Sequence, residues 1–543
     1  MNIKPMFNTN EMVSLEDYMR SCGVADTKEY LNNQYVEPWQ KYDNIIEMAQ
    51  AINNAIKMRD KFYIITDSDF DGLGTALVQY LYLTKCDSTV DIKILMHNKN
   101  PKAHGFEDDE IMDWFRNESK EHIGTIWIGD AGSMNIKECK ELSELGYTIL
   151  ISDHHLMSKS NDYAIVVNNQ ASEKVINKSL SGCGVTFKVC QAIDWLNNTN
   201  YSRDLISFVH ITNISDSCGF TKTEQQTFRF WGLQMLYPTL LPFIEAFNYK
   251  GGTTNKDFSF GIVSRFNAVI RVGTLEQKQA LFTALATGKN IDQAIDICKK
   301  CKTQQDKTRD SLLENNITIE LDSNIVVGKI DTKTPLTGLI ANKLLSKYNK
   351  PIFLVHERKN GTVEGSCRST VDLKELCSQS KVFNYAEGHE CSFGISWQKE
   401  NEPKVYEWIA SLTLSEPHID VLQSHTINSL PKYLFNEFGL NKGLYGQDMK
   451  DPLIHIHDIT INSNDISVMG ANGRTIKITK NGIDFMWFII ANADKEKLLN
   501  TPYTLEVVGT MGINEWNGVR TPQIIVENFE ITESKQKTVD DIF

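Results

Sequence analysis

Five short apolar runs, each followed by a polar loop, most constrain what this chain can fold into. They cover residues 61–66, 92–96, 125–128, 147–151 and 164–167, and helical stretches lie between them. Short apolar runs bounded by turn residues are typical of buried strands, and strands that alternate with helices predict a doubly wound parallel sheet. Ligands of such sheets bind beyond the carboxyl ends of the strands. We therefore expect the polar residues after these runs to gather at one edge of the sheet.

The first of these loops is rich in acids. Asp67, Asp69 and Asp71 alternate in the segment DSDFDG, directly after the first apolar run. Alternating carboxylates at a strand end can point at two different cations, and hard divalent ions prefer oxygen ligands. The same pattern also occurs in calcium loops and solvated turns, so alone it predicts no single chemistry.

Later loops add one acid each and a pair of histidines. Asp130 lies in IGDAGS, where it can bridge two metals or simply form a turn. In SDHH, one imidazole can bind a metal while the other reaches a phosphate, and Asp153 can orient the ligand ring; a surface loop is the alternative. Asp216 closes a further apolar run in NISDSCG.

Together these clusters form a mixed set of carboxylate and imidazole ligands. Such a set suits Mn²⁺ and Mg²⁺ better than an ion that prefers thiolates. Two ions roughly 3.5–4 Å apart clamp a phosphate, activate a water and stabilise the leaving oxygen. The residues therefore favour hydrolysis of phosphodiester or phosphoanhydride bonds.

The rest of the chain predicts further domains. Helical spacing at 45–58 and across 226–310 is followed by a second α/β pattern, with strands at 325–330 and 351–356 around a helix at 336–348. Short β patterns from 451 onward indicate a small barrel. The expected division is a helical segment of the first domain (1–60), the parallel-sheet domain (61–225), a helical connector (226–310), a second α/β domain (311–450), a barrel (451–533) and a flexible tail (534–543).

Composition limits the classes of protein that remain. The net charge of −13 argues against a protein that coats nucleic acid through its overall field, although a local basic channel is compatible with it. The 11 scattered cysteines are typical of reduced thiols in a cytosolic protein. The start lacks the apolar core of a signal peptide, and no apolar run reaches the roughly 18 residues that span a membrane. We expect a cytoplasmic protein with no membrane partner.

The motifs occur in the order and spacing of the DHH phosphoesterases. ITDSDFDG, IGDAGS and NISDSCG resemble three motifs of that family, and ISDHHL resembles the DHH motif itself. GSCRS (365–369) and AEGHECSFG (386–394) resemble GSGRS and FGGHxxAAG of the DHH-associated domain. NEWNGVRTPQIIVENFEI (514–531) is similar to the last hairpin of the oligonucleotide-binding (OB) barrel of RecJ exonucleases. The resemblance to RecJ implies an α/β protein with a DHH-type parallel-sheet domain, an α/β DHH-associated domain and a C-terminal OB-type β-barrel.

The resemblance also implies roles at a centre of two Mn²⁺ or Mg²⁺ ions. Asp130 bridges the two ions, His155 contacts the scissile phosphate, and Asp71 and Asp153 act on the ions through other ligands or water. The implied metal ligands are Asp67, Asp69, Asp130, His154 and Asp216.

Two further residues resemble a pocket for the terminal phosphate of the strand. The resemblance implies that Ser366 and Arg368 hold this phosphate and that His389 faces the same channel. Arg suits the task because its fork bonds two oxygens at once. Lys99 stands where RecJ proteins usually have Arg, and a Lys offers a point charge without the fork.

Two glycines of this pocket are also replaced. Glu387 takes the place of the first Gly of the GGH motif, and Cys367 the place of the middle Gly of GSGRS. These replacements affect the expected preference for one end of the strand more than they affect the expected metal chemistry.

The expected barrel supplies a surface for a single strand. OB-type barrels hold strands by a basic groove and aromatic stacking. Trp516 lies in a turn-like NEWNG and is expected to be exposed, whereas Trp487 and Phe488 are either stacking platforms or barrel core. The tail, QKTVDDIF, resembles peptides that dock on sliding clamps and the acidic tails of single-strand-binding proteins.

The resemblance implies a metal-dependent single-stranded DNA exonuclease that degrades 5′→3′ to 5′-mononucleotides in repair, recombination or replication. A phosphodiesterase for RNA or for short or cyclic oligonucleotides is one alternative. A catalytically silent scaffold of the replication machinery is another, although all six residues of the metal and phosphate set are present.

Overall fold

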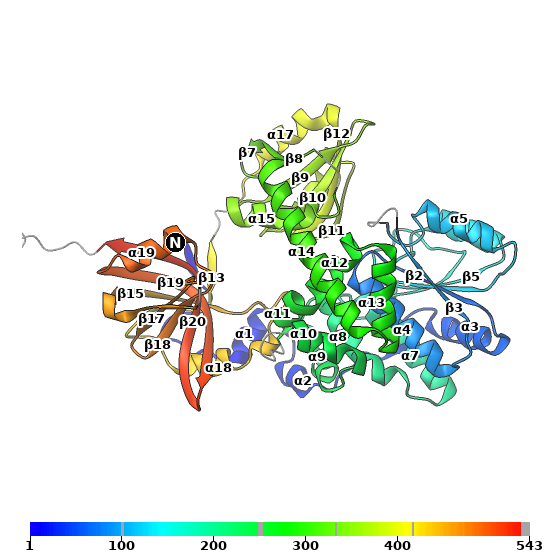
Figure 1. Ribbon diagram of the computed structural model, residues 1–543, viewed down its shortest axis with the longest axis horizontal. Coiled ribbons are helices and arrows are strands. Elements are labelled where there is room, and N and C mark those ends of the chain that lie inside the picture. Colours follow the sequence, from blue (N-terminus) through cyan, green and yellow to red (C-terminus); the bar gives the residue numbers. More distant parts are fainter. Residues whose placement is uncertain (99–102, 248–253, 332–333, 415–417, 471, 534–543) are drawn as a thin grey trace, which may run out of the picture.

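The computed structural model describes residues 1–98, 103–247, 254–331, 334–414, 418–470 and 472–533. Three domains follow one another along the chain, and a long helix joins the first to the second (Figure 1).

The first domain is built on a parallel sheet of five strands in the order β3-β2-β4-β5-β6. Every pair in this sheet is parallel, as expected from the alternating pattern. The strands are β2 (Phe62–Thr66), β3 (Ile92–Met96), β4 (Thr125–Gly129), β5 (Thr148–Asp153) and β6 (Ile165–Asn168).

Helices cover both faces of this sheet and bury two separate cores. Neighbouring residues of β2 point to opposite faces, so that Ile64 joins one core and Tyr63 the other. The helices of the first core are α3 (Ile45–Met58), α4 (Phe70–Cys86) and α7 (Gly182–Asn197), and those of the second are α5 (Asp109–Glu118) and α6 (Ile136–Glu144).

The connector is helical, as predicted, and extends the first core. The last of its helices, α14, has 25 residues and runs from the first domain to the second (Figure 1). The helices that follow α7 up to the second domain are α8 (Ile206–Ser215), α9 (Thr223–Gln234), α10 (Leu241–Phe247), α11 (Asn255–Phe258), α12 (Ser264–Val272), α13 (Leu275–Thr287) and α14 (Ile291–Asn315), and α8 lies before the predicted connector.

The second domain carries a mixed six-stranded sheet in the order β11-β12-β10-β9-β8-β7, in which β8 and β9 are parallel. Helix α15 packs on one face of it, and α17 on the other. The elements are β7 (Ile317–Asp322), β8 (Val326–Ile330), α15 (Thr337–Tyr348), β9 (Ile352–Glu357), β10 (Thr362–Arg368), α16 (Lys374–Gln379), β11 (Tyr385–His389), β12 (Ser392–Gln398) and α17 (Glu402–Ser411).

The third domain is the OB-type unit, a seven-stranded sheet in the order β14-β15-β19-β20-β18-β17-β16. Within the part of the chain that the structure describes, β14 and β16 form open edges. Its elements are β14 (Ser424–Thr426), α18 (Tyr433–Gly439), β15 (Leu453–Ile461), β16 (Ile466–Met469), β17 (Thr475–Lys480), β18 (Ile483–Trp487), α19 (Asn492–Leu499), β19 (Tyr503–Trp516) and β20 (Val519–Glu533).

The first sixty residues divide between two domains. Strand β1 (Ile3–Pro5) pairs with β13 (Ile419–Val421), and helices α1 (Leu15–Ser21) and α2 (Thr27–Asn32) share a core with the OB-type unit. Tyr42 and α3 belong to the first core, where we expected the whole segment. The apolar face of a helix is visible in sequence, but the surface that buries it is not.

The structure is that of a protein with free thiols. All eleven cysteines are unpaired. Across the described ranges, no helix is both long and apolar enough to cross a membrane.

Candidate metal centre

The candidate centre lies at the carboxyl ends of β2, β4 and β5, where the topology brings the predicted acids together. Asp67 follows β2, and Asp69 caps the first turn of α4 by accepting hydrogen bonds from the amides of Asp71 (2.8 Å) and Gly72 (3.2 Å). A Cβ at Gly72 would lie 2.4 Å from the Cβ of Asp67. Only glycine therefore lets the chain turn this closely after the strand.

Asp71 points into the protein and ties α4 to α7. Its buried carboxylate accepts hydrogen bonds from the amides of Gly182 (2.8 Å) and Cys183 (3.2 Å), at the N-terminus of α7. A helix N-terminus is a favourable place for a negative charge. Burial, and then the nearby carboxylate of Asp216, raise the pKa of Asp71 well above its usual range. Asp71 thus fixes the floor of the centre.

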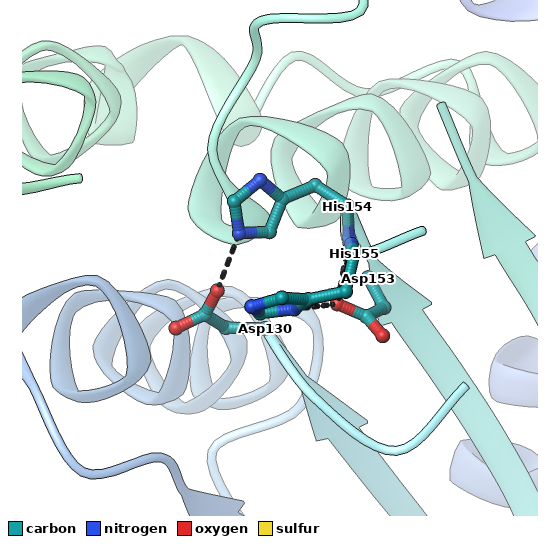
Figure 2. A group of neighbouring side chains, drawn as sticks. All are labelled: Asp130, Asp153, His154 and His155. Atoms are coloured by element: carbon teal, nitrogen blue, oxygen red, sulfur yellow. Dashed lines mark hydrogen bonds and ion pairs between the residues drawn. The ribbon is translucent and has the colours of Figure 1, made fainter. Parts of the chain in front are cut away.

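Asp130 has a strained backbone and lies between the acids that follow β2 and the histidine loop that follows β5. Its backbone has φ of +66°, its amide donates to the carbonyl of Ser152 (3.0 Å), and its side chain is buried. Its Oδ1 lies 3.1 Å from Nε2 of His154 (Figure 2). Non-glycine residues with positive φ cluster at functional sites because the strain persists only where surrounding structure imposes it.

The two histidines differ in environment. His154 lies between two acids, with Nε2 near Asp130 and Nδ1 3.7 Å from Oδ2 of Asp216. His155 is 55% exposed, and its Nδ1 bonds to Oδ1 of Asp153 at 2.8 Å (Figure 2). Desolvation opposes protonation of His155, but the charge of Asp153 raises its pKa to about 10.

Asp153 organises the loop that carries both histidines. Its Oδ1 also accepts from the amides of His154 (2.7 Å) and His155 (3.2 Å), and its Oδ2 accepts from the amide of Ser133 (3.2 Å). Burial alone would raise the pKa of Asp153, but His155 and these donors hold it well below its usual range. Asp153 is therefore a permanent anion that positions the imidazoles.

The donor set fits divalent cations. Asp130, Asp153, His154 and His155 offer ligand atoms within 4.8 Å of one another, and so do Asp71, His154 and Asp216. Desolvation and the neighbouring carboxylates raise the pKa of Asp130 well above its usual range, and a bound cation would oppose this shift by favouring the ionised form. Oxygen ligands with one or two imidazoles match Mn²⁺ or Mg²⁺.

The structure adds residues that the sequence reasoning missed. Nδ1 of His104 lies 2.8 Å from Oδ2 of Asp67, and the amide of Gly105 donates to Oδ1 (3.2 Å). Arg271 of α12 lies near enough to Asp69 for the two charges to interact. His104 follows Lys99 in the segment HNKNPKAHGF, where no motif marks the histidine, and no local pattern in α12 distinguishes its arginine.

Ser366 and Arg368 lie on one face of β10, the face that α15 covers. Nη1 of Arg368 donates to the carbonyl of Cys367 (2.6 Å), and a Cβ at Gly338 of α15 would lie 2.3 Å from Nη2. The charges of Arg368 and Arg271 act on each other, so the second domain directs a guanidinium toward the first.

The structure does not describe the side chains of two predicted substrate residues. Lys99 lies outside the described residues. His389 lies on β11, and its side chain is likewise outside them.

The predicted aromatic residues of the OB-type unit separate clearly. Trp516 stands at the tip of the β19–β20 hairpin and is 73% exposed, as expected. Trp487 is buried against Phe529, whereas Phe488 is exposed. Three basic side chains of this unit are each paired with an acid: Lys477 with Asp484, Lys480 with Asp465 and Arg520 with Glu515.

Comparisons with known proteins agree with this architecture. The family model for the DHH family, N-terminal domain, matches residues 61–211, and that for the RecJ OB domain matches residues 435–528. The chain therefore combines a DHH-type domain with a RecJ-type OB domain. The chain is 27% identical to YorK, a prophage-derived protein of Bacillus subtilis named as a single-strand DNA-specific exonuclease, over 96% of this chain and 97% of YorK.

Other relatives carry the RecJ name. Bacillus subtilis RecJ, named as a single-stranded-DNA-specific exonuclease, is 26% identical to this chain. The aligned region covers 90% of this chain and 63% of Bacillus subtilis RecJ. The structure of Thermus thermophilus RecJ in complex with Mn²⁺ matches with a TM-score of 0.73 at 18% identity, over 98% of this chain and 79% of that one. This likeness establishes a shared fold of all three domains.

Proposed function

We propose that this chain is a metal-dependent exonuclease that hydrolyses single-stranded DNA. The observation that carries the proposal is the buried cluster at the strand ends, in which Asp130 and Asp216 flank His154 at 3.1 and 3.7 Å. The names of the RecJ relatives support the substrate, and the Mn²⁺ and Mg²⁺ of the similar Thermus structures support the ions.

In this proposal, the strand-end acids hold two ions. Such ions would supply the charge that polarises a phosphate and activates a water. Asp130 lies between the clusters and is suited to bridge them. The proposed ligands are Asp67, Asp69, Asp130, His154 and Asp216.

The remaining residues of the cluster hold other groups in place or donate a hydrogen bond to the substrate. In the metal-free protein Asp153 raises the pKa of His155 to about 10, which favours an imidazolium that can donate to a phosphate oxygen. Its exposed ring leaves an edge available to substrate. Asp153 holds the histidine loop, and Asp71 holds α4 against α7.

We further propose that the strand enters by its 5′ end. Arg368 and Ser366 would bind the terminal phosphate, with Arg271 beside them and Lys99 and His389 along the same channel, so that 5′-mononucleotides are released in the 5′→3′ direction. Two guanidiniums from different domains provide the charge that a terminal phosphate requires.

The OB-type unit would hold the unpaired strand upstream of the cut. Trp516 offers an exposed ring at the end of a long hairpin, and such rings stack on bases regardless of sequence. We propose a cytoplasmic role in repair, recombination or replication. The tail from 534 to 543, which lies outside the described residues, would engage single-strand-binding protein or a sliding clamp.

The test is degradation of long single-stranded DNA in Mn²⁺, labelled at either end, beside duplex DNA, RNA and a dinucleotide. Early release of the 5′ label from single-stranded DNA alone is expected. Asp130→Asn should lower the rate by roughly a thousandfold, since charge stabilisation by a metal supplies several kcal/mol. Asn is the better replacement than Ala because it tolerates the positive φ at this position. Activity restricted to RNA or dinucleotides, or full activity of Asp130→Asn, would contradict the proposal.

A further inference from the structure

His104 contacts a proposed metal ligand although no motif singles it out. Its Nδ1 lies 2.8 Å from Oδ2 of Asp67, while its ring is 59% exposed. It comes from the loop between β3 and α5, whereas the proposed ligands come from strand ends and from the end of α8. The contact therefore arises from packing rather than from a shared motif.

The loop holds this imidazole firmly in place. Ala103 and Phe106, on either side of it, are buried. The amide of Gly105 donates to Oδ1 of Asp67 (3.2 Å), and that of Phe106 donates to Oδ1 of Asn135 (3.0 Å). Gly105 has φ of +56°, and a Cβ there would lie 2.4 Å from Oδ1 of Asn135. A ring anchored in this way is preorganised for binding.

We propose that His104 is a further metal ligand, which binds through Nδ1 the ion held by Asp67. The inference rests on the proposed two-metal function. Neighbouring ligands of an octahedral ion with bonds of about 2.1 Å lie about 3 Å apart. The His104–Asp67 pair at 2.8 Å and the His154–Asp130 pair at 3.1 Å both have this separation.

The ring also lies within electrostatic reach of other groups of the centre. The charges of Asp69 and His155 act on His104 together with that of Asp67. If His104 only held Asp67 in place from the side away from the ions, it would lie far from Asp69, which is assigned to the other ion. Each ion would then have one imidazole, His104 for the first and His154 for the second.

An imidazole at the first ion changes metal preference. Nitrogen ligands suit Mn²⁺ more than Mg²⁺, which favours oxygen and water. His104 would therefore raise affinity for Mn²⁺ at this position and affect Mg²⁺ little. A residue that merely orients Asp67 would strengthen both ions alike.

The experiment measures ion binding directly on the full chain. Titration calorimetry gives the affinities of His104→Gln for Mn²⁺ and Mg²⁺, and pulsed electron paramagnetic resonance of bound Mn²⁺ counts coordinated imidazole nitrogens. His122→Gln is the matched control, because His122 is an exposed histidine whose side chain makes no contact with the centre. We expect His104→Gln to weaken Mn²⁺ about ten- to a hundredfold, to leave Mg²⁺ within about threefold, and to lose one of two nitrogen signals.

Each other outcome rejects the assignment. Equal weakening of both ions would make His104 a positioning residue only, and an unchanged nitrogen count would exclude it as a ligand. Failure of the proposed function looks different. In that case the unsubstituted protein itself would bind no Mn²⁺ through nitrogen, and Asp130→Asn would leave its metal affinity unchanged.

Discussion

Gly182→Ala tests how closely the metal centre depends on the packing of α7. A Cβ at Gly182 would lie 2.5 Å from both Cα and Cβ of Asp130 and 2.6 Å from its Oδ1. Carbon atoms pack comfortably at about 3.5 Å, so Asp130 or the start of α7 must move by about 1 Å. Neither can move freely, since the Gly182 amide is bonded to Asp71 and the Asp130 amide to Ser152.

The expected losses follow from that displacement. Overpacking of this kind costs about 1–3 kcal/mol of unfolding free energy. A shift of about 1 Å in a group that positions the reacting atoms costs roughly a hundredfold in rate. The distances between a metal and its ligand atoms tolerate a deviation of only about 0.2 Å. The affinity for Mn²⁺ should therefore fall together with the rate of cleavage.

Gly184→Ala provides the matched control in the same helical turn. The atoms nearest to a Cβ there belong to the buried side chain of Leu180, at 2.4 Å, and not to Asp130, so the strain falls on the core. Urea unfolding, Mn²⁺ calorimetry and cleavage of end-labelled single-stranded DNA are measured on both variants. We expect both to lose stability but only Gly182→Ala to lose Mn²⁺ affinity and rate. If the two variants retain the same affinity and rate, the steric argument is wrong.

Three further substitutions probe separate parts of the molecule. Lys188→Met should lower the unfolding free energy by about 3–5 kcal/mol in urea titrations, because it leaves Glu224 buried without its cation; a loss below about 1 kcal/mol would mean that water reaches the carboxylate. Asp153→Asn removes the anion that holds the pKa of His155 at about 10. The imidazole should then titrate near its ordinary pKa of 6.5 and lose its charge as the pH rises through 7, as followed by NMR of the metal-free protein. A pKa still above 9 in this variant would refute the pairing. Trp516→Ala should weaken binding of a long single strand by roughly 1–3 kcal/mol in fluorescence anisotropy and leave dinucleotide cleavage unchanged; equal effects on both would exclude a stacking role.

Much of the first domain was predictable because its signals are local. Buried parallel strands are continuous apolar runs, and the residue that ends each run is fixed by the chain itself. Asp67, Asp130 and His154 could therefore be assigned to one sheet edge from the sequence. The exposure of Trp516 at a hairpin tip followed from its turn-like neighbours in the same way.

The sequence alone determined which acids and histidines stand at strand ends, and hence the class of chemistry. The tertiary structure decided which of them meet: His154 with Asp216, and His104 with Asp67. It also decided that helices α1 and α2 pack on the OB-type unit. Contacts of this kind depend on how separate elements pack together. Periodicity shows which face of an element is apolar, but the partner is chosen by shape and burial across the whole fold.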